Sequence, residues 1–115
     1  MMDDVFCKII SGNLEKAIYQ DDDVVVVNDI SPSAPVHMLV IPRKHYTSIE
    51  DFSESDAQLI GKMLLVARKV ARDAGLSENG YRITMNTGAH GGQAVPHFHI
   101  HVLGGKALGG KMVAD

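Results

Sequence analysis

The sequence predicts an α+β fold, with a mostly antiparallel sheet covered by helices on one face. Short runs of apolar and β-branched residues are typical of strands, and one longer segment, 53–74, has apolar residues at helical spacing. The predicted strands are joined mainly by short connections, which favour antiparallel neighbours. We therefore expect one sheet with one long and one short helix.

Size and composition indicate a single domain over residues 1–115, with a flexible tail from about residue 105. The 115 residues are 45% hydrophobic and 22% charged, as in ordinary globular proteins. The net charge of −3 gives no overall attraction to nucleic-acid polymers or to an anionic membrane. No apolar run could span a membrane, and Cys7 is the single cysteine, so we expect a cytoplasmic protein without disulfides.

The first half of the chain contains a short helix, a hairpin, a loop and a buried strand. Gly12 can end the helix, and an acidic turn at Asp21 and Asp22 joins the two strands of the hairpin. Two prolines disfavour helix in the loop, and Pro42 ends the following strand. The expected ranges are 5–10 for the helix, 17–20 and 23–29 for the hairpin, 30–35 for the loop and 36–41 for the strand.

The second half contains the long helix, a strand, a glycine-rich loop and a final strand. Ser53 and Asp56 have the spacing of a capping box, and Gly75 supplies the stop. The expected ranges are 53–74, 81–86, 88–96 and 97–103. The predicted apolar face of the helix comprises Leu59, Ile60, Met63, Leu64, Val66, Ala67, Val70 and Ala71.

Three histidines, His97, His99 and His101, alternate with Phe98 and Ile100 in the final strand. Successive side chains on a strand point to opposite faces, so the three imidazoles share one face while the apolar residues face the core. The row spans on the order of 13 Å, which is too long for one metal ion. A phosphate ester with its leaving group fits this length better.

Imidazoles in such a row suit nucleophilic attack on phosphorus. Neutral imidazole is a nucleophile at pH 7, and a neighbouring imidazolium can stabilise phosphate charge or protonate a leaving group. His99 has a histidine on each side and is the expected nucleophile. The alternative is an exposed row without function, which the regular alternation and the flanking glycines disfavour.

The segment from His97 to Leu103 resembles the signature of the histidine-triad family, in which three histidines alternate with apolar residues. The similarity covers nearly the whole chain and is greatest to the Hint-like branch, the nucleoside phosphoramidase type. The other segments that resemble this branch are 6–10, 28–37, 41–45, 80–82, Asn86 and 91–93.

This resemblance implies a five-stranded sheet and a homodimer in which two such sheets join. It also implies a metal-independent hydrolase without cofactors that acts on purine nucleoside 5′-phosphate derivatives, namely phosphoramidates and aminoacyl- or acyl-adenylates. His99 would become nucleotidylated, and water would then release the nucleoside monophosphate. Some relatives carry zinc on cysteine pairs, which a chain with Cys7 alone lacks.

The same resemblance gives roles to individual residues. His101 would contact the phosphate and the leaving group, His97 would hold His99 in the reactive tautomer, and His37 would support the cluster from the neighbouring strand. Asp29 would bind the ribose hydroxyls. The other nucleotide-binding residues would be Phe6, Ile9 and Ile30 around the base, and Asn86, Gly92 and Gln93, with Ala94 beside them, around the phosphate.

Several of these residues have a simpler interpretation when taken alone. Asp29 would be a loop acid, Phe6 and Ile9 ordinary core, and His37 a core histidine. Successive backbone N–H groups of a glycine loop can bind an anion, but such loops are usually turns. The two remaining histidines, His45 and His90, lie in predicted loops and are expected at the surface.

Two positions depart from the pattern of the Hint-like branch. Ala94 replaces a serine that is common there near the leaving group, and Pro96 stands where an aromatic residue is common. Loss of the hydroxyl is expected to lower activity on phosphoramidates or to alter the preferred leaving group.

Three other functions are compatible with parts of the pattern. Dinucleoside polyphosphate hydrolysis is disfavoured by the loop at 28–35, which is typical of the Hint-like branch. A non-catalytic nucleotide-binding regulatory protein would not need the nucleophile His99. A metal-binding module using two triad histidines and His37 would lack nearby carboxylate or cysteine partners.

Overall fold

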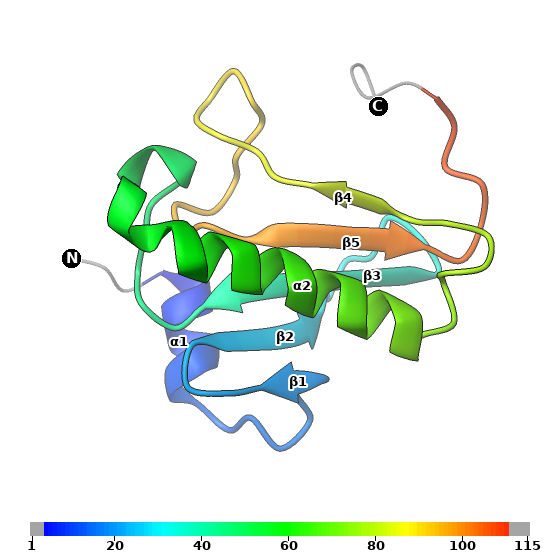
Figure 1. Cartoon of the computed structure of the whole chain (residues 1–115), viewed down its shortest axis with the longest axis horizontal. Helices are drawn as coiled ribbons and strands as arrows, with labels where there is room; N and C mark the ends of the chain where they lie inside the picture. Colours follow the sequence, from blue (N-terminus) through cyan, green and yellow to red (C-terminus); the bar gives the residue numbers. More distant parts are fainter. Residues whose placement is uncertain (1–3, 111–115) are drawn as a thin grey trace.

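Five strands form one antiparallel sheet in the order β1-β2-β3-β5-β4 in the computed structural model, which describes residues 4–110 (Figure 1). The strands are β1 (Tyr19–Gln20), β2 (Val24–Asn28), β3 (Val36–Pro42), β4 (Arg82–Thr84) and β5 (Ile100–Gly104). The helices are α1 (Val5–Ser11) and α2 (Ala57–Asp73), with 3-10 turns at Ile49–Asp51 and Glu54–Asp56. The predicted fold class, including the long and the short helix, is confirmed.

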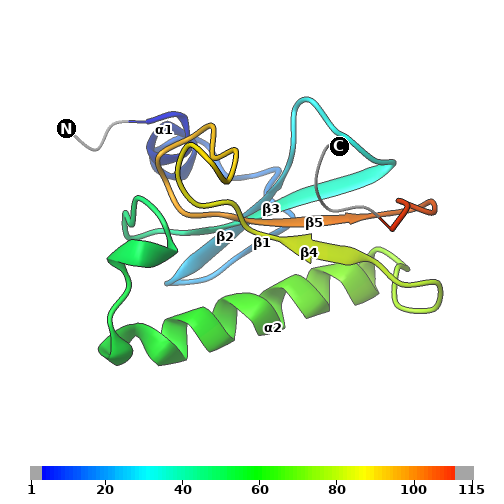
Figure 2. The same cartoon turned by 90° about the horizontal axis from the view of Figure 1, so that it is seen from above.

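The two helices lie on opposite faces of the sheet (Figure 2), so the expectation of helices on one face is wrong. α2 packs against a cluster that includes Met38 and Val40, whereas Phe6 of α1 packs against Leu39 and Ile41. Side chains alternate along β3, which is apolar on both sides. Each face of the sheet therefore needs its own cover.

α2 buries a narrower stripe than its apolar pattern suggests. The buried residues are Met63, Val66, Ala67, Val70 and Ala71. Leu64, which was predicted on this face, is 39% exposed, because the sheet covers only one side of the helix. The helix also begins at Ala57 rather than at Ser53, since a 3-10 turn with the predicted capping box precedes it.

The strand carrying the histidine row begins later than predicted, at Ile100. The Phe98 N–H donates to the Tyr46 carbonyl at 2.6 Å, and the His97 N–H donates to the Val95 carbonyl at 2.8 Å. Phe98 therefore bonds to the loop after β3, and residues 97–99 lie outside β5.

Each of the other strands also has at least one end that differs from the prediction. β2 is shorter by one residue at each end, and β1 and β4 are shorter as well, as is common at the two edges of a sheet. β3 is longer, because Pro42 still pairs opposite Val24. None of these changes alters the order or direction of the strands.

The register between β3 and β5 places His37 beside the histidine row. His37 lies opposite Leu103, and Leu39 lies opposite His101. Opposite residues share a face, so His37 and His101 are diagonal neighbours on the face that α1 partly covers. The sheet itself thus assembles this part of the site.

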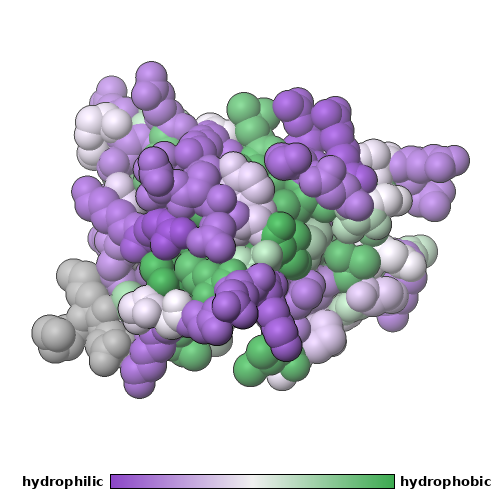
Figure 3. Space-filling model, turned by 90° about the horizontal axis from the view of Figure 1, so that it is seen from below, coloured by the Kyte–Doolittle hydropathy of each residue, from purple (hydrophilic) through white to green (hydrophobic). Residues whose placement is uncertain are grey.

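The surface seen from the β1 edge is mainly hydrophilic, with smaller hydrophobic areas between the polar side chains (Figure 3). The exposed large hydrophobic residues are scattered over several elements and are Val5, Ile18, Ile30, Leu64, Leu65 and Met85. Within residues 4–110, no helix combines the length and the apolar content needed to cross a membrane.

Candidate active site

The three imidazoles of the row lie on one face of the sheet, as the alternation predicts. Phe98 and Ile100 belong to the core that α2 covers, on the other side. The rings of His99 and His101 lie with their centroids 4.8 Å apart. His97 and His99 are only 0% and 8% exposed, so this part of the row is enclosed rather than open to solvent.

His99 is held in one tautomer by the main chain. Its Nδ1 lies 2.7 Å from the carbonyl oxygen of His97. A carbonyl only accepts, so the proton of the neutral ring is on Nδ1 and the lone pair is on Nε2. The ring also meets Phe6 edge-on, with centroids 4.8 Å apart. These contacts orient an imidazole that can act as a nucleophile through Nε2.

His101 receives the opposite tautomer through a chain of hydrogen bonds. The Ser33 N–H donates to His37 Nδ1 at 3.0 Å, so the proton of neutral His37 is on Nε2. That Nε2 lies 2.9 Å from His101 Nδ1 and donates to it. His101 then carries its own proton on Nε2. Adjacent histidines thus offer a lone pair, on His99, and a donor, on His101.

Asp29 lies at the end of β2, close to His37. Its Oδ2 is 3.5 Å from His37 Nε2, and its Oδ1 accepts from the Ser31 N–H at 2.8 Å. The side chain is one-fifth exposed, so the carboxylate can still accept hydrogen bonds from a ligand.

Burial lowers the pKa values of both His99 and His101. For His99, burial is the largest cause and outweighs the opposing effect of the bond to the His97 carbonyl. For His101, burial together with the charges of His99 and His37 lowers the pKa to about 4. Both rings are therefore neutral at pH 7, which is the state that the tautomers above require.

The residues predicted to contact a base lie on α1 and on the loop after β2. Phe6 is buried against His99, and Ile9 packs on the same cluster as Phe6. Ile30, next to Asp29, is 96% exposed. α1 thus brings Phe6 and Ile9 to the row, while Ile30 projects into solvent.

The glycine-rich loop is shaped by the side chain of Gln93. Its Oε1 accepts from the Gly88 N–H at 2.9 Å, and its Nε2 donates to the carbonyls of Thr47 at 2.6 Å and Val95 at 2.9 Å. The amide group of Gln93 is therefore bonded within the loop and to its neighbours.

Two glycines in this loop are required by the backbone. Gly92 has a φ of +78°, which favours glycine. At Gly91, an added Cβ would lie 2.3 Å from the Thr87 carbonyl oxygen. Ala94, which follows the loop, is exposed.

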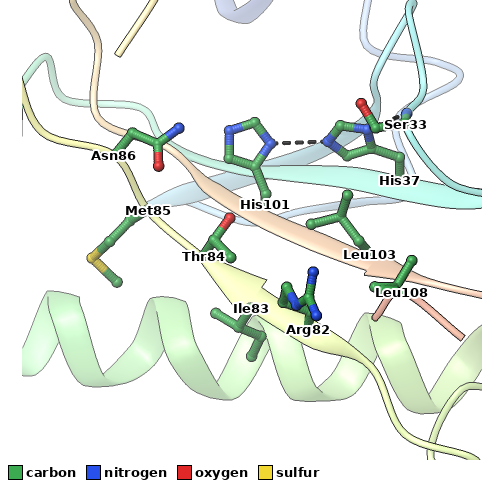
Figure 4. A pocket seen from close by; sticks show the side chains of 10 residues that line it. All are labelled: Ser33, His37, Arg82, Ile83, Thr84, Met85, Asn86, His101, Leu103 and Leu108. Atoms are coloured by element: carbon green, nitrogen blue, oxygen red, sulfur yellow. Dashed lines mark hydrogen bonds between the residues drawn. The ribbon is translucent and has the colours of Figure 1, made fainter. Parts of the chain in front are cut away.

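A cavity of about 690 Å³ adjoins the histidine row on the β4 side (Figure 4). His101 and His37 line it together with Asn86, which lies beyond His101 as seen from His37 (Figure 4). The other residues around it include Ser33, Arg82, Thr84 and Leu103. Of the predicted phosphate-binding residues, Asn86 is thus the one that shares a cavity with His101.

His45 is not the surface residue that its loop position suggested. Its Nε2 lies 3.0 Å from Asp4 Oδ2 and 2.9 Å from the carbonyl oxygen of Pro96. Its ring also packs edge-on against His97. The loop after β3 folds back onto the row, which a local pattern does not reveal. His90, in contrast, is exposed as predicted.

Two groups of side chains have the donor atoms that a metal ion needs. Within the described part of the chain, the ligand atoms of each group lie within 4.8 Å of one another. One group is Asp4, Cys7, His45 and His97, and the other is Asp29, His37 and His101. The absence of a metal from the mechanism stays a prediction.

Sequence reasoning missed the residues that fix the histidine rings from outside the row. Ser33 supplies its backbone N–H, for which no residue pattern exists. Asp4 could have been found as a helix N-cap, because it directly precedes the predicted helix and aspartate is common at that position. Its contact with His97, however, joins residues from nearly opposite ends of the chain.

The fold and the paired histidine tautomers define a histidine-triad protein. The chain matches the HIT domain over residues 12–108 and therefore belongs to the HIT family. It is 47% identical over 106 residues to the purine nucleoside phosphoramidase of Escherichia coli (strain K12), covering 91% of this chain and 89% of that protein.

Solved structures give the same result. A HIT family hydrolase from Clostridium thermocellum superposes with a TM-score of 0.91 and 42% identity, covering 98% of this chain and 99% of that one. A histidine triad protein from Clostridium difficile superposes with a TM-score of 0.90 and 39% identity, covering 96% and 97% of the two chains. The family predicted from the His97–Leu103 segment is confirmed.

Proposed function

We propose that this protein hydrolyses purine nucleoside 5′-phosphate derivatives, namely phosphoramidates and aminoacyl- or acyl-adenylates, through a nucleotidyl-His99 intermediate. The observation that carries this proposal is the pair of complementary tautomers, with a lone pair on His99 Nε2 and a proton on His101 Nε2. The similarity to a phosphoramidase and to HIT family hydrolases supports it.

The reaction has two steps on phosphorus. His99 Nε2 attacks the α-phosphorus, a P–N bond forms, and the bond to the leaving group breaks. His101 donates a hydrogen bond from Nε2 to the phosphate or to the leaving atom, which stabilises the developing charge. Water then breaks the P–N bond and releases the nucleoside monophosphate. Overall one water is consumed: its hydroxyl goes to phosphorus and its proton to the leaving group.

The nucleotide would lie across the α1 face. Asp29 accepts from the ribose hydroxyls, and Phe6, Ile9 and Ile30 contact the purine. Asn86 and the backbone of Gly92 and Gln93, with Ala94 beside them, hold the phosphate. The side-chain amide of Gln93 is already hydrogen-bonded to other residues of the protein. We therefore expect Gln93 to support phosphate binding by shaping the loop rather than by contacting the phosphate with its side chain.

We also propose the assembly that the resemblance implies. β4 is an edge strand, and pairing of two β4 strands would join two sheets into one. A single domain with a flexible tail from about residue 105, a cytoplasmic location, and the absence of nucleic-acid and membrane partners remain predictions. Within the described part of the predicted tail, the carbonyl of Gly109 accepts a hydrogen bond from Arg82 of β4.

The test is turnover of an adenosine 5′-phosphoramidate in the presence of a chelator. Wild type should release AMP, while His99→Ala should lose at least about 10³-fold in rate because it removes the nucleophile. His90→Ala, an exposed histidine outside the row, is the matched control and should retain wild-type activity.

Mass spectrometry should detect an AMP adduct on wild type but not on His99→Ala. Binding of AMP without hydrolysis of phosphoramidate or dinucleoside polyphosphate would contradict the proposal and favour a regulatory nucleotide-binding protein. Preferential cleavage of dinucleoside polyphosphates would contradict the substrate class alone.

A further inference from the structure

A second network of side chains surrounds His97, the histidine furthest from the cavity. Asp4 Oδ1 lies 3.2 Å from His97 Nδ1, and Asp4 Oδ2 lies 3.0 Å from His45 Nε2. The rings of His45 and His97 meet edge to face, with centroids 4.8 Å apart. One carboxylate thus bridges two imidazoles from distant parts of the chain.

The hydrogen-bond partners show which ring nitrogens donate. His45 Nε2 has two acceptors, the carboxylate of Asp4 and the carbonyl of Pro96, so it carries a proton. His97 Nε2 lies 3.1 Å from the carbonyl of Pro42 and also carries a proton, and a hydrogen bond from its Nδ1 to the Asp4 carboxylate requires a second proton on the ring. A nitrogen that binds a metal ion needs its lone pair, so these bonds describe a hydrogen-bonded network in place of a metal centre.

We propose that Asp4 is a positioning residue that holds His99 in its reactive orientation by way of His97, an inference that rests on the proposed function. The His97 side chain is fixed at both ends, by Asp4 and by Pro42, and its carbonyl accepts the Nδ1 hydrogen of His99. If His97 moved, its carbonyl would no longer hold the proton of His99 on Nδ1, and the lone pair would no longer be fixed on Nε2.

Asp4 also supports Phe6, the aromatic residue that packs against His99. Its Oδ1 accepts from the Cys7 N–H at 2.8 Å and so caps α1, the helix that presses Phe6 against His99. The carboxylate is one-tenth exposed. Burial raises the pKa of Asp4, but the Cys7 N–H, the charge of His97 and the bond from His45 outweigh it and keep the group ionised.

A set of substitutions separates positioning from helix capping. Asn and Ser are good N-caps, but neither can accept from both imidazoles as a carboxylate does. Asp4→Asn and Asp4→Ser should therefore lower kcat about 10-fold and change KM less than about 2-fold, since orientation is lost and binding groups remain. Asp4→Ala removes the cap as well and should lose more. Asp22→Asn, an exposed acidic residue in the β1–β2 turn, is the control.

Nitrogen NMR of the histidine rings gives a readout independent of turnover. In wild type, the neutral His99 ring should be protonated on Nδ1 alone, and in Asp4→Asn it should be a mixture of tautomers. His45→Gln should reproduce part of this change, and its effect should not add to that of Asp4→Asn, because both remove the same bridge.

Three outcomes would overturn the inference. Wild-type kcat and a wild-type His99 tautomer in Asp4→Asn and Asp4→Ser, with a loss only in Asp4→Ala, would make Asp4 a helix cap and nothing more. One equivalent of metal in untagged wild type that disappears in Asp4→Asn would replace the network with a metal site. A wild-type His99 tautomer in all variants would show that Asp4 does not act on His99. If wild type itself fails to turn over, the proposed function falls, while the tautomer measurement still decides the role of Asp4.

Discussion

At the scale of single residues, the site depends on which ring nitrogen of each histidine carries a proton. Main-chain groups decide this: the His97 carbonyl for His99, and the Ser33 N–H, through His37, for His101. The rings of His99 and His101, identical in chemistry, therefore differ in which nitrogen carries the proton. The type of residue at each position was predictable, whereas the partner that sets each tautomer was not.

The lowered pKa values of His99 and His101 predict activity on the acid side of neutrality. kcat/KM should stay level from about pH 8 down to below pH 6.5 and fall only when His99 in the free protein takes up a proton. His97, Asp29 and Asp4 are the charged or titratable groups that act on His99. A pH profile of kcat/KM between pH 4 and 8 tests this, and an acid midpoint at or above 6.5 would contradict it.

The same shift predicts a loss of stability in acid. The pKa of His101 is about 4 in the folded protein and near 6.5 when unfolded, so the unfolded state binds more protons between these values. The free energy of unfolding should therefore fall as pH is lowered from 6.5 to 4. In urea unfolding, His101→Gln should show a weaker dependence over this window than wild type, and an equal dependence would refute the assignment.

At the scale of elements, sequence patterns predicted which elements exist more reliably than where they end. α2 was found from its apolar period, but its 3-10 entry and the exposure of Leu64 follow from what packs against it. The late start of β5 arises because Phe98 bonds to Tyr46, a contact between segments far apart in sequence.

Two glycines offer a contrast between a loop and a helix. Gly91→Ala should disturb the glycine-rich loop, because its Cβ would lie 2.3 Å from the Thr87 carbonyl oxygen, and should raise KM by about 10-fold with a modest loss of stability. Steady-state kinetics with thermal unfolding measure both effects. Unchanged KM would remove this loop from substrate binding.

Gly61→Ala is the matched control in α2, where an added Cβ meets nothing within 4 Å. Alanine favours a helix interior over glycine by about 0.5–1 kcal/mol, so this variant should be more stable than wild type, with unchanged kinetics.

At the scale of the whole molecule, the sheet brings together residues from both ends of the chain. α1 contacts the row from one face, and α2 supports it from the other. β4 leaves one edge of the sheet open beside the cavity that contains His101.

The proposed homodimer can be tested at this edge. Light scattering should give twice the mass of one chain at about 10 µM. Met85→Asp, which places a charge next to β4 at a residue 37% exposed, should shift the protein toward monomer. Leu65→Asp, an exposed apolar residue of α2, is the matched control. A monomeric wild type would contradict the assembly, without affecting the proposed chemistry.

By itself, the sequence determined the strands and helices, the shared face of His97, His99 and His101, and the family, because these follow from local periodicity and from a contiguous motif. Only the tertiary structure decided that the helices cover opposite faces, that His45 and Asp4 enclose His97, and which nitrogen of each histidine is protonated. Those features depend on hydrogen bonds and packing between residues far apart in the chain, for which no local pattern carries a signal.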